Sequence, residues 1–154
     1  MSSKKTEKAA AYFDNGFCCS QAVFTTFATE YGIEEELALK IATQFGGGAR
    51  KGEMCGSVSG ALMALGLKYG FSDGNAQKEK ELAHQKAEEF MNRFIEREGT
   101  VVCRELLGHD LSKPGELEKC RASGIFKTIC PEMVRCAAEI VEQMLREENE
   151  TTYL

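Results

Sequence analysis

Apolar residues recur every three or four positions along most of the chain, which is the spacing that gathers them on one face of an α-helix. Alternating β-branched runs are missing, and no Asn-Gly or Asp-Gly turn joins two apolar stretches. The pattern therefore predicts an all-α fold, a compact single-domain bundle of about six to seven helices. We expect helices over residues 5–14, 20–30, 34–45, 55–69, 72–98 and 101–107, a loop over 108–115, and a final helix that begins at Pro131.

Small residues follow one face of the helix expected over 55–69. Gly56, Gly60 and Ala64 lie at positions i, i+4 and i+8, so they form a narrow ridge that another helix can approach closely. The approaching helix belongs either to the same chain or to a second copy. The ridge is therefore compatible with a homodimer.

Length and charge restrict the class of protein. The chain has 154 residues, which is the length of one domain, and we expect residues 1–154 to form a single domain. The formal net charge is -5 and basic residues are scattered among acidic ones, which argues against a nucleic-acid partner. The amino-terminal segment lacks the apolar core of a secretory signal, and the uncharged stretch 55–67 is too short to span a bilayer. The sequence therefore predicts a cytoplasmic protein without membrane insertion.

The seven cysteines carry the candidate chemistry. In a reducing compartment they indicate metal ligands or catalytic groups rather than a disulfide framework. The amino terminus of a helix stabilises a thiolate and lowers the pKa of a thiol, so a cysteine at a helix start is a candidate for both roles. Cys130 precedes Pro131, a residue favoured at the first helical position. Four cysteines lie at expected helix starts: Cys19, Cys55, Cys103 and Cys130.

Four helix ends can converge in a bundle, so these four thiols are candidate ligands of an iron centre and candidate redox groups. The alternative is that a cysteine is a small buried apolar residue, and we keep that interpretation for Cys120 and Cys136. Cys18 is adjacent to Cys19 and stays undecided. His109, six residues after Cys103, is a weaker candidate for a proton shuttle or reserve ligand.

Several known motifs are absent from the sequence. There is no C-x-x-C, which argues against a zinc ribbon and a thioredoxin-type dithiol, and no C-x-x-C-H for covalent haem. The glycines of residues 47–52 do not form a phosphate loop, because Glu53 follows them instead of lysine and no strand precedes them. Neither a Ser-His-Asp order nor H-E-x-x-H occurs, so the sequence assigns no enzymatic reaction.

The four cysteines and their neighbours resemble the C_GCAxxG_C_C family of redox-active proteins. The matching stretches are residues 16–23, 45–48, 55–60, 103–108, 130–134 and 137–138, which together extend over most of the chain. The chain departs from the family pattern at two positions. Ser57 stands where the family has alanine, and Cys18 stands where asparagine is common.

The resemblance implies a four-cysteine site with a redox function. A similar domain occurs in split-Soret cytochromes, dimeric proteins linked to an iron-sulfur centre and haem. The haem does not carry over, because this chain lacks the attachment motifs.

Three hypotheses follow from the residues and the resemblance. In the first, Cys19, Cys55, Cys103 and Cys130 hold an iron-sulfur cluster, with 2Fe-2S favoured, for electron transfer to an unidentified redox partner protein or for redox sensing. In the second, two of the same cysteines act as a thiol-disulfide oxidoreductase or sensor. In the third, the chain is a non-enzymatic helical scaffold or dimer whose cysteines only fill space.

Overall fold

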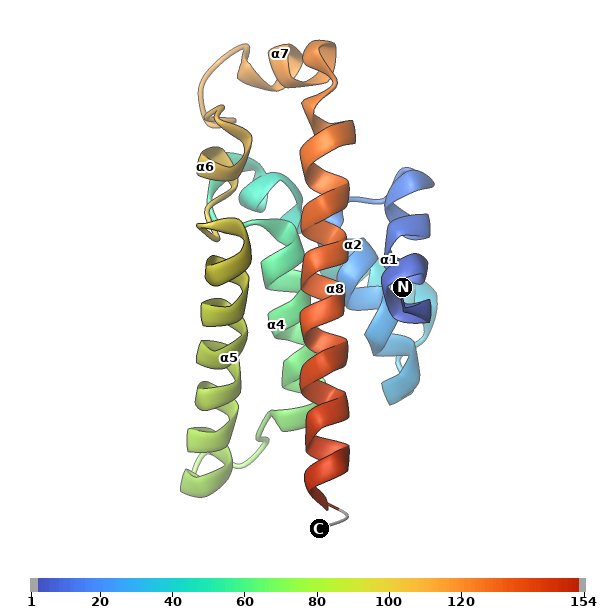
Figure 1. The fold of residues 1–154 in the computed structure, drawn as a ribbon, viewed down its shortest axis with the longest axis vertical. Helices are drawn as coiled ribbons and strands as arrows, with labels where there is room; N and C mark the ends of the chain where they lie inside the picture. Colours follow the sequence, from blue (N-terminus) through green and yellow to red (C-terminus); the bar gives the residue numbers. More distant parts are fainter. Residues whose placement is uncertain (1–2, 153–154) are drawn as a thin grey trace.

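The computed structural model describes residues 3–152, and side chains up to residue 148. Figure 1 shows an all-helical chain, as predicted, and residues 3–152 contain no β-strand. The α-helices of this part are α1 (Lys4–Asp14), α2 (Cys19–Ala28), α3 (Glu35–Ala42), α4 (Gly56–Tyr69), α5 (Gln77–Glu98), α6 (Cys103–Leu107), α7 (Glu116–Ser123) and α8 (Ile125–Thr152). None of them is both long enough and apolar enough to cross a membrane.

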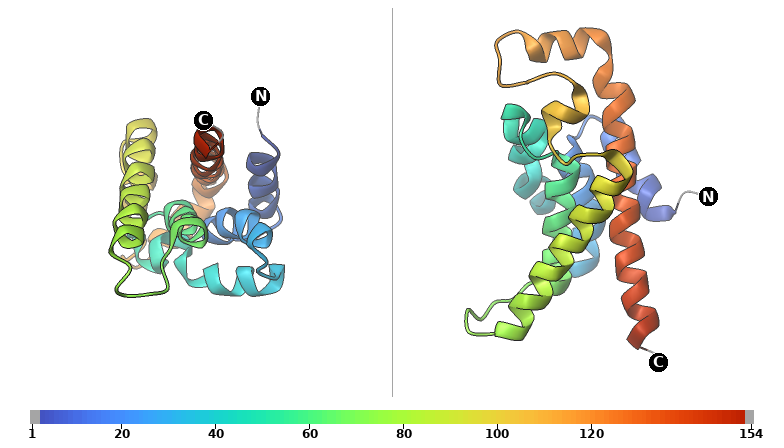
Figure 2. Two further views of the ribbon diagram at one scale, coloured as in Figure 1. Left: turned by 90° about the horizontal axis from the view of Figure 1, so that it is seen from below. Right: turned by 60° about the vertical axis from the view of Figure 1, so that its left-hand side comes forward.

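The helices form two layers. Viewed from below in Figure 2, α5, α8 and α1 stand side by side in one layer, while α4 and α2 form the second. Helix α3 packs on α2. Nine of the ten residues of α2 are buried, so this helix is the centre of the fold. Phe27, Phe90, Phe94, Ile140 and Met144 are among the largest fully buried side chains and join α2, α5 and α8 into one core.

The ridge of small residues on α4 packs against α2 within the same chain. A Cβ atom added to Gly60 would lie 2.7 Å from the carbonyl oxygen of Ser20, and one added to Gly56 would lie 2.5 Å from Sγ of Cys19. Real Cβ atoms do not approach other atoms so closely. Glycine at these positions is therefore what allows the two helices to meet at their amino-terminal ends.

Two helix starts lie five or more residues from the sequence-based prediction. Helix α5 begins at Gln77, five residues later than expected, after a turn in which the backbone N–H of Asn75 donates to the Asp73 carboxylate. The expectation that the last helix begins at Pro131 is wrong, because α8 begins at Ile125 and contains Pro131. Gly124 adopts a left-handed conformation with φ of 75°, which ends α7 and lets α8 start at the next residue.

Candidate functional site

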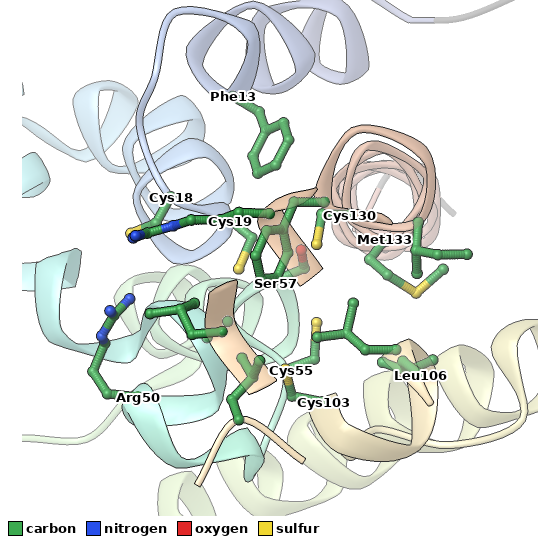
Figure 3. A pocket seen from close by; sticks show the side chains of 18 of the residues that line it. Phe13, Cys18, Cys19, Arg50, Cys55, Ser57, Cys103, Leu106, Cys130 and Met133 are labelled. Atoms are coloured by element: carbon green, nitrogen blue, oxygen red, sulfur yellow. The ribbon is translucent and has the colours of Figure 1, made fainter. Parts of the chain in front are cut away.

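A cavity of about 320 Å³ lies where the amino-terminal ends of α2, α4 and α6 meet the first turns of α8. Figure 3 shows the cysteines around it, together with Phe13, Leu106 and Met133. The four cysteines selected from the sequence all line this cavity, as does Cys18. We refer to it as the cysteine cavity, and to Cys19, Cys55, Cys103 and Cys130 as the cysteine centre.

Cys19 and Cys55 form a hydrogen-bonded pair of thiols. Cys19 is the first residue of α2, Cys55 is the N-cap of α4, and both are more than nine-tenths buried. The hydrogen bond to Cys55 is the main reason that the pKa of Cys19 lies well above its ordinary value, and burial raises this pKa further. The same hydrogen bond lowers the pKa of Cys55 more than burial raises it. Of the two thiols, Cys19 therefore holds its proton more strongly and Cys55 is the more readily ionised.

Backbone amides also point at both sulfurs. Hydrogen bonds from the N–H groups of Gly47 and Ser20 lower the pKa of Cys19, and those of Ser57 and Val58 act in the same way on Cys55. Such hydrogen bonds stabilise negative charge on sulfur. These hydrogen bonds thus favour a thiolate at the Cys19–Cys55 pair, but only Cys55 has the lowered pKa that we expected from a helix start.

The amide of Gly47 reaches Cys19 because residues 47–50 form a left-handed turn. Ala49 and Arg50 have φ values of 53° and 67°, a conformation that costs non-glycine residues about 1–2 kcal/mol each. Gly48 is required in this turn, because a Cβ atom there would lie 2.4 Å from the backbone nitrogen of Glu53 and 2.8 Å from Cβ of Cys103. The strained turn therefore packs directly against the cysteine centre.

A short antiparallel pairing places Cys55 beside Cys103. The N–H of Cys55 donates to the carbonyl of Val101 at 2.8 Å, and the N–H of Cys103 donates to the carbonyl of Glu53 at 2.6 Å. Met54 and Val102 form the bridge between them. Two cysteines 48 positions apart in the sequence are held together by these backbone hydrogen bonds.

Cys103 and Cys130, like Cys19, do not have the lowered pKa that we expected from a helix start. Burial is the main cause that raises the pKa of each of these two thiols to about 12, and neighbouring cysteines, with Cys19 first among them, contribute to the rise. Cys103 does begin α6, but this helix has only five residues and burial outweighs its effect. Cys130 lies inside α8, five residues after Ile125, so the expected helix start is missing there. The cysteine centre thus has one half supplied with amide donors and one apolar half.

The remaining sequence candidates lie outside the cysteine centre. The sulfur of Cys18 contacts Gln21 and Ser20 and points away from the other sulfurs in Figure 3. Nδ1 of His109 lies 3.1 Å from Oε2 of Glu116, and His109 does not line the cavity. Cys120 is fully buried in α7. A negative charge on Cys120 would raise the pKa of both Cys103 and Cys130, so this cysteine lies near the cysteine centre. Cys136 is buried in the core next to Arg97 and Glu98.

The sulfurs surround the cavity rather than converge on one point. Among the residues that the structure describes, no three His, Cys, Asp or Glu side chains are grouped closely enough to hold a metal ion. The donor set nevertheless fits an iron-sulfur cluster, which takes four thiolates spread over more than one iron. The described cavity lining contains no carboxylate and no imidazole that would compete with them.

Ser57 is a site residue whose importance the sequence analysis missed. It is fully buried, lines the cysteine cavity, and its hydroxyl has no hydrogen-bond partner among the residues that the structure describes. The signal in the sequence was the polar residue at the position where the resembled family has alanine.

Comparison with known proteins supports the resemblance noted from the sequence. The model of a family described as "Putative redox-active protein (C_GCAxxG_C_C)" matches residues 17–144. Searches of the curated proteins and of the solved structures find no match to the chain. The matched residues include all four members of the cysteine centre and the glycine-rich turn that supports it. The chain therefore belongs to the C_GCAxxG_C_C family of redox-active proteins.

Proposed function

We propose that this protein transfers electrons or senses redox state through an iron-sulfur cluster, of the 2Fe-2S type, held by Cys19, Cys55, Cys103 and Cys130. The observation that carries the proposal is the gathering of four thiols from four separate segments around one buried cavity. Four cysteine thiolates are the usual ligand set of such clusters. The bound cluster would supply one-electron chemistry that the amino-acid side chains lack.

The chain's own residues would control the properties of this centre. Cys19 and Cys55 receive hydrogen bonds from four backbone amides, and hydrogen bonds to sulfur are one means by which proteins set a reduction potential. Apolar side chains such as Leu106, Ile129 and Met133 line the other side and exclude water. Arg50 adds a positive charge at the edge of the cavity.

The proposal is tested by purification without oxygen, followed by measurement of iron content and visible absorbance before and after reconstitution. We expect iron and a visible absorption band in the wild-type protein, and loss of both when any one of the four cysteines is changed to serine. Cys136→Ser is the matched control, because this cysteine is also buried but lies in the core, outside the cavity. A wild-type protein that takes up no iron even after reconstitution would contradict the proposal.

A second candidate function rests on the hydrogen bond between Cys19 and Cys55. A donor thiol beside an acceptor thiol of lowered pKa is the arrangement of a reactive dithiol. Oxidation would form an S–S bond between the two residues, and their two electrons and two protons would pass to the oxidant, which is either a disulfide that becomes two thiols or hydrogen peroxide that becomes two water molecules. Mass spectrometry of the iron-free protein after mild peroxide treatment tests this function, and recovery of both thiols unmodified would refute it. A redox partner protein and a homodimer remain predictions from the sequence under either function.

A further inference from the structure

We propose that the Ser57 hydroxyl donates a hydrogen bond to a sulfur atom of the redox group at the cysteine centre, either a bound cluster or the Cys19–Cys55 pair. This hydrogen bond raises the reduction potential of that group. The proposal rests on the proposed redox function and deepens it. It concerns a residue by which this chain departs from the alanine of the resembled family pattern.

The first observation is the unsatisfied hydroxyl. Ser57 has no exposed surface, yet its Oγ atom has no hydrogen-bond partner among the described residues. Leaving a buried hydroxyl unpaired is unfavourable, whereas alanine would fill nearly the same space without that cost. The polar group is therefore explained best by a partner that the protein alone does not supply.

The second observation is the direction of the side chain. Ser57 is the second residue of α4 and lines the cysteine cavity. Figure 3 shows its hydroxyl pointing into the cavity between Cys19 and Cys130. Its backbone N–H already donates to the sulfur of Cys55, so the same residue directs two donors toward the cysteine centre.

The effect on the potential follows from charge. When the centre takes up one electron from an external donor, negative charge on its sulfur atoms increases and no proton of Ser57 is transferred. A hydrogen bond from the hydroxyl therefore stabilises the reduced state more than the oxidised state. The same reasoning applies to the dithiol form, because reduction of a neutral disulfide yields sulfur that can carry negative charge. In both cases Ser57 favours reduction.

The test compares Ser57→Ala with the wild type and with Thr25→Val. Thr25 is also fully buried with an unpaired hydroxyl, but it lies on α2 and does not line the cavity, so Thr25→Val is the matched control. Each protein is reconstituted, checked for equal iron content, and titrated by spectroelectrochemistry. We expect Ser57→Ala to lower the equilibrium constant for reduction about tenfold, which is about 59 mV for one electron, and Thr25→Val to leave it unchanged.

The possible outcomes separate this inference from the proposed function. Equal potentials in the wild type and Ser57→Ala would overturn the role of Ser57 while the iron-sulfur function stands. An equal shift in Thr25→Val would also overturn it, because loss of any buried hydroxyl would then suffice. If the wild type binds no iron but forms the Cys19–Cys55 disulfide, the titration is made in thiol-disulfide buffers, where the same tenfold change is about 30 mV for two electrons. A protein that shows neither centre would overturn both proposals.

Discussion

The substitution Gly56→Ala tests whether the contact between α2 and α4 positions the cysteine centre. An alanine Cβ atom would lie 2.5 Å from Sγ of Cys19 and 3.0 Å from the carbonyl oxygen of Phe45. An ordinary contact begins at 3.4 Å, so relief of the overlap requires about 0.9 Å more separation from Sγ of Cys19 and about 0.4 Å more from the Phe45 oxygen. The oxygen belongs to the backbone and cannot rotate away. We expect overpacking of this kind to cost about 1–3 kcal/mol in the free energy of unfolding.

Gly66→Ala in the same helix is the matched control. A Cβ atom at Gly66 meets nothing within 4 Å, so alanine there should stabilise the helix by about 1 kcal/mol through its higher helix propensity. Because the propensity gain is at least as large at Gly66 as at the first residue of α4, the difference between the two variants isolates the steric cost.

The assay combines denaturant unfolding of the iron-free proteins with iron content after reconstitution. Gly56→Ala should be less stable than Gly66→Ala by at least the steric cost, and each 1 kcal/mol corresponds to about 2–4 °C in Tm for a chain of this size. It should also bind less iron, because the movement separates Cys55 from Cys19. If Gly56→Ala is as stable as Gly66→Ala and holds as much iron, the contact does not position the centre.

Three further substitutions test separate features. Gly48→Ala should destabilise the protein more than Gly56→Ala, because an alanine would have a φ of 61° and a Cβ atom 2.4 Å from the Glu53 nitrogen. We expect a lower unfolding midpoint and loss of iron binding. An unchanged midpoint would contradict the left-handed turn at residues 47–50. Ser57→Ala should stabilise the iron-free protein by about 1 kcal/mol in denaturant unfolding, because it removes a buried hydroxyl that has no partner among the described residues. A loss of stability would indicate that the hydroxyl has a hydrogen-bond partner in the iron-free protein. Pro131→Ala should stabilise α8 by about 1–3 kcal/mol in the same assay, because alanine supplies the backbone N–H that the carbonyl of residue 127 lacks as a partner. Destabilisation would contradict a helix that continues through residue 131.

The sequence was sufficient to predict the elements that carry regular helical patterns. The starts of α1, α2 and α4 lie within one residue of the prediction, because apolar periodicity begins there and glycines precede α2 and α4. The ridge on α4 was also identified in advance, although its partner was not. Whether a ridge of small residues meets α2 or a second chain depends on tertiary packing, which local spacing does not encode.

The helix boundaries between residues 108 and 130 could not be predicted from local sequence patterns, for a different reason. Helix α7 has a weak apolar pattern and is preceded and followed by left-handed glycines, Gly115 and Gly124. Pro131 then suggested a helix start, since proline is favoured at the first helical position. In the structure the partly buried residues Phe126 and Ile129 line the cavity, and α8 extends through this turn upstream of the proline. Tertiary contacts outweighed the local signal.

The position of Cys130 follows from helix register rather than from a helix end. Val134, Ala137, Val141 and Met144 form the buried face of α8, and continuing their spacing toward the amino terminus places Cys130 on the same side of the helix. The four cysteines that line the cavity were thus selected for a reason that holds for Cys19 and Cys55 but not for Cys130.

This distinction has a chemical consequence for the centre. Backbone amides can stabilise a negative charge on the Cys19–Cys55 half, whereas Cys103 and Cys130, with pKa values raised to about 12 by burial, keep their protons near neutral pH. Only a cation bound between the two halves would make all four sulfurs thiolates together. We therefore expect iron content to distinguish between the two proposed functions in a given preparation.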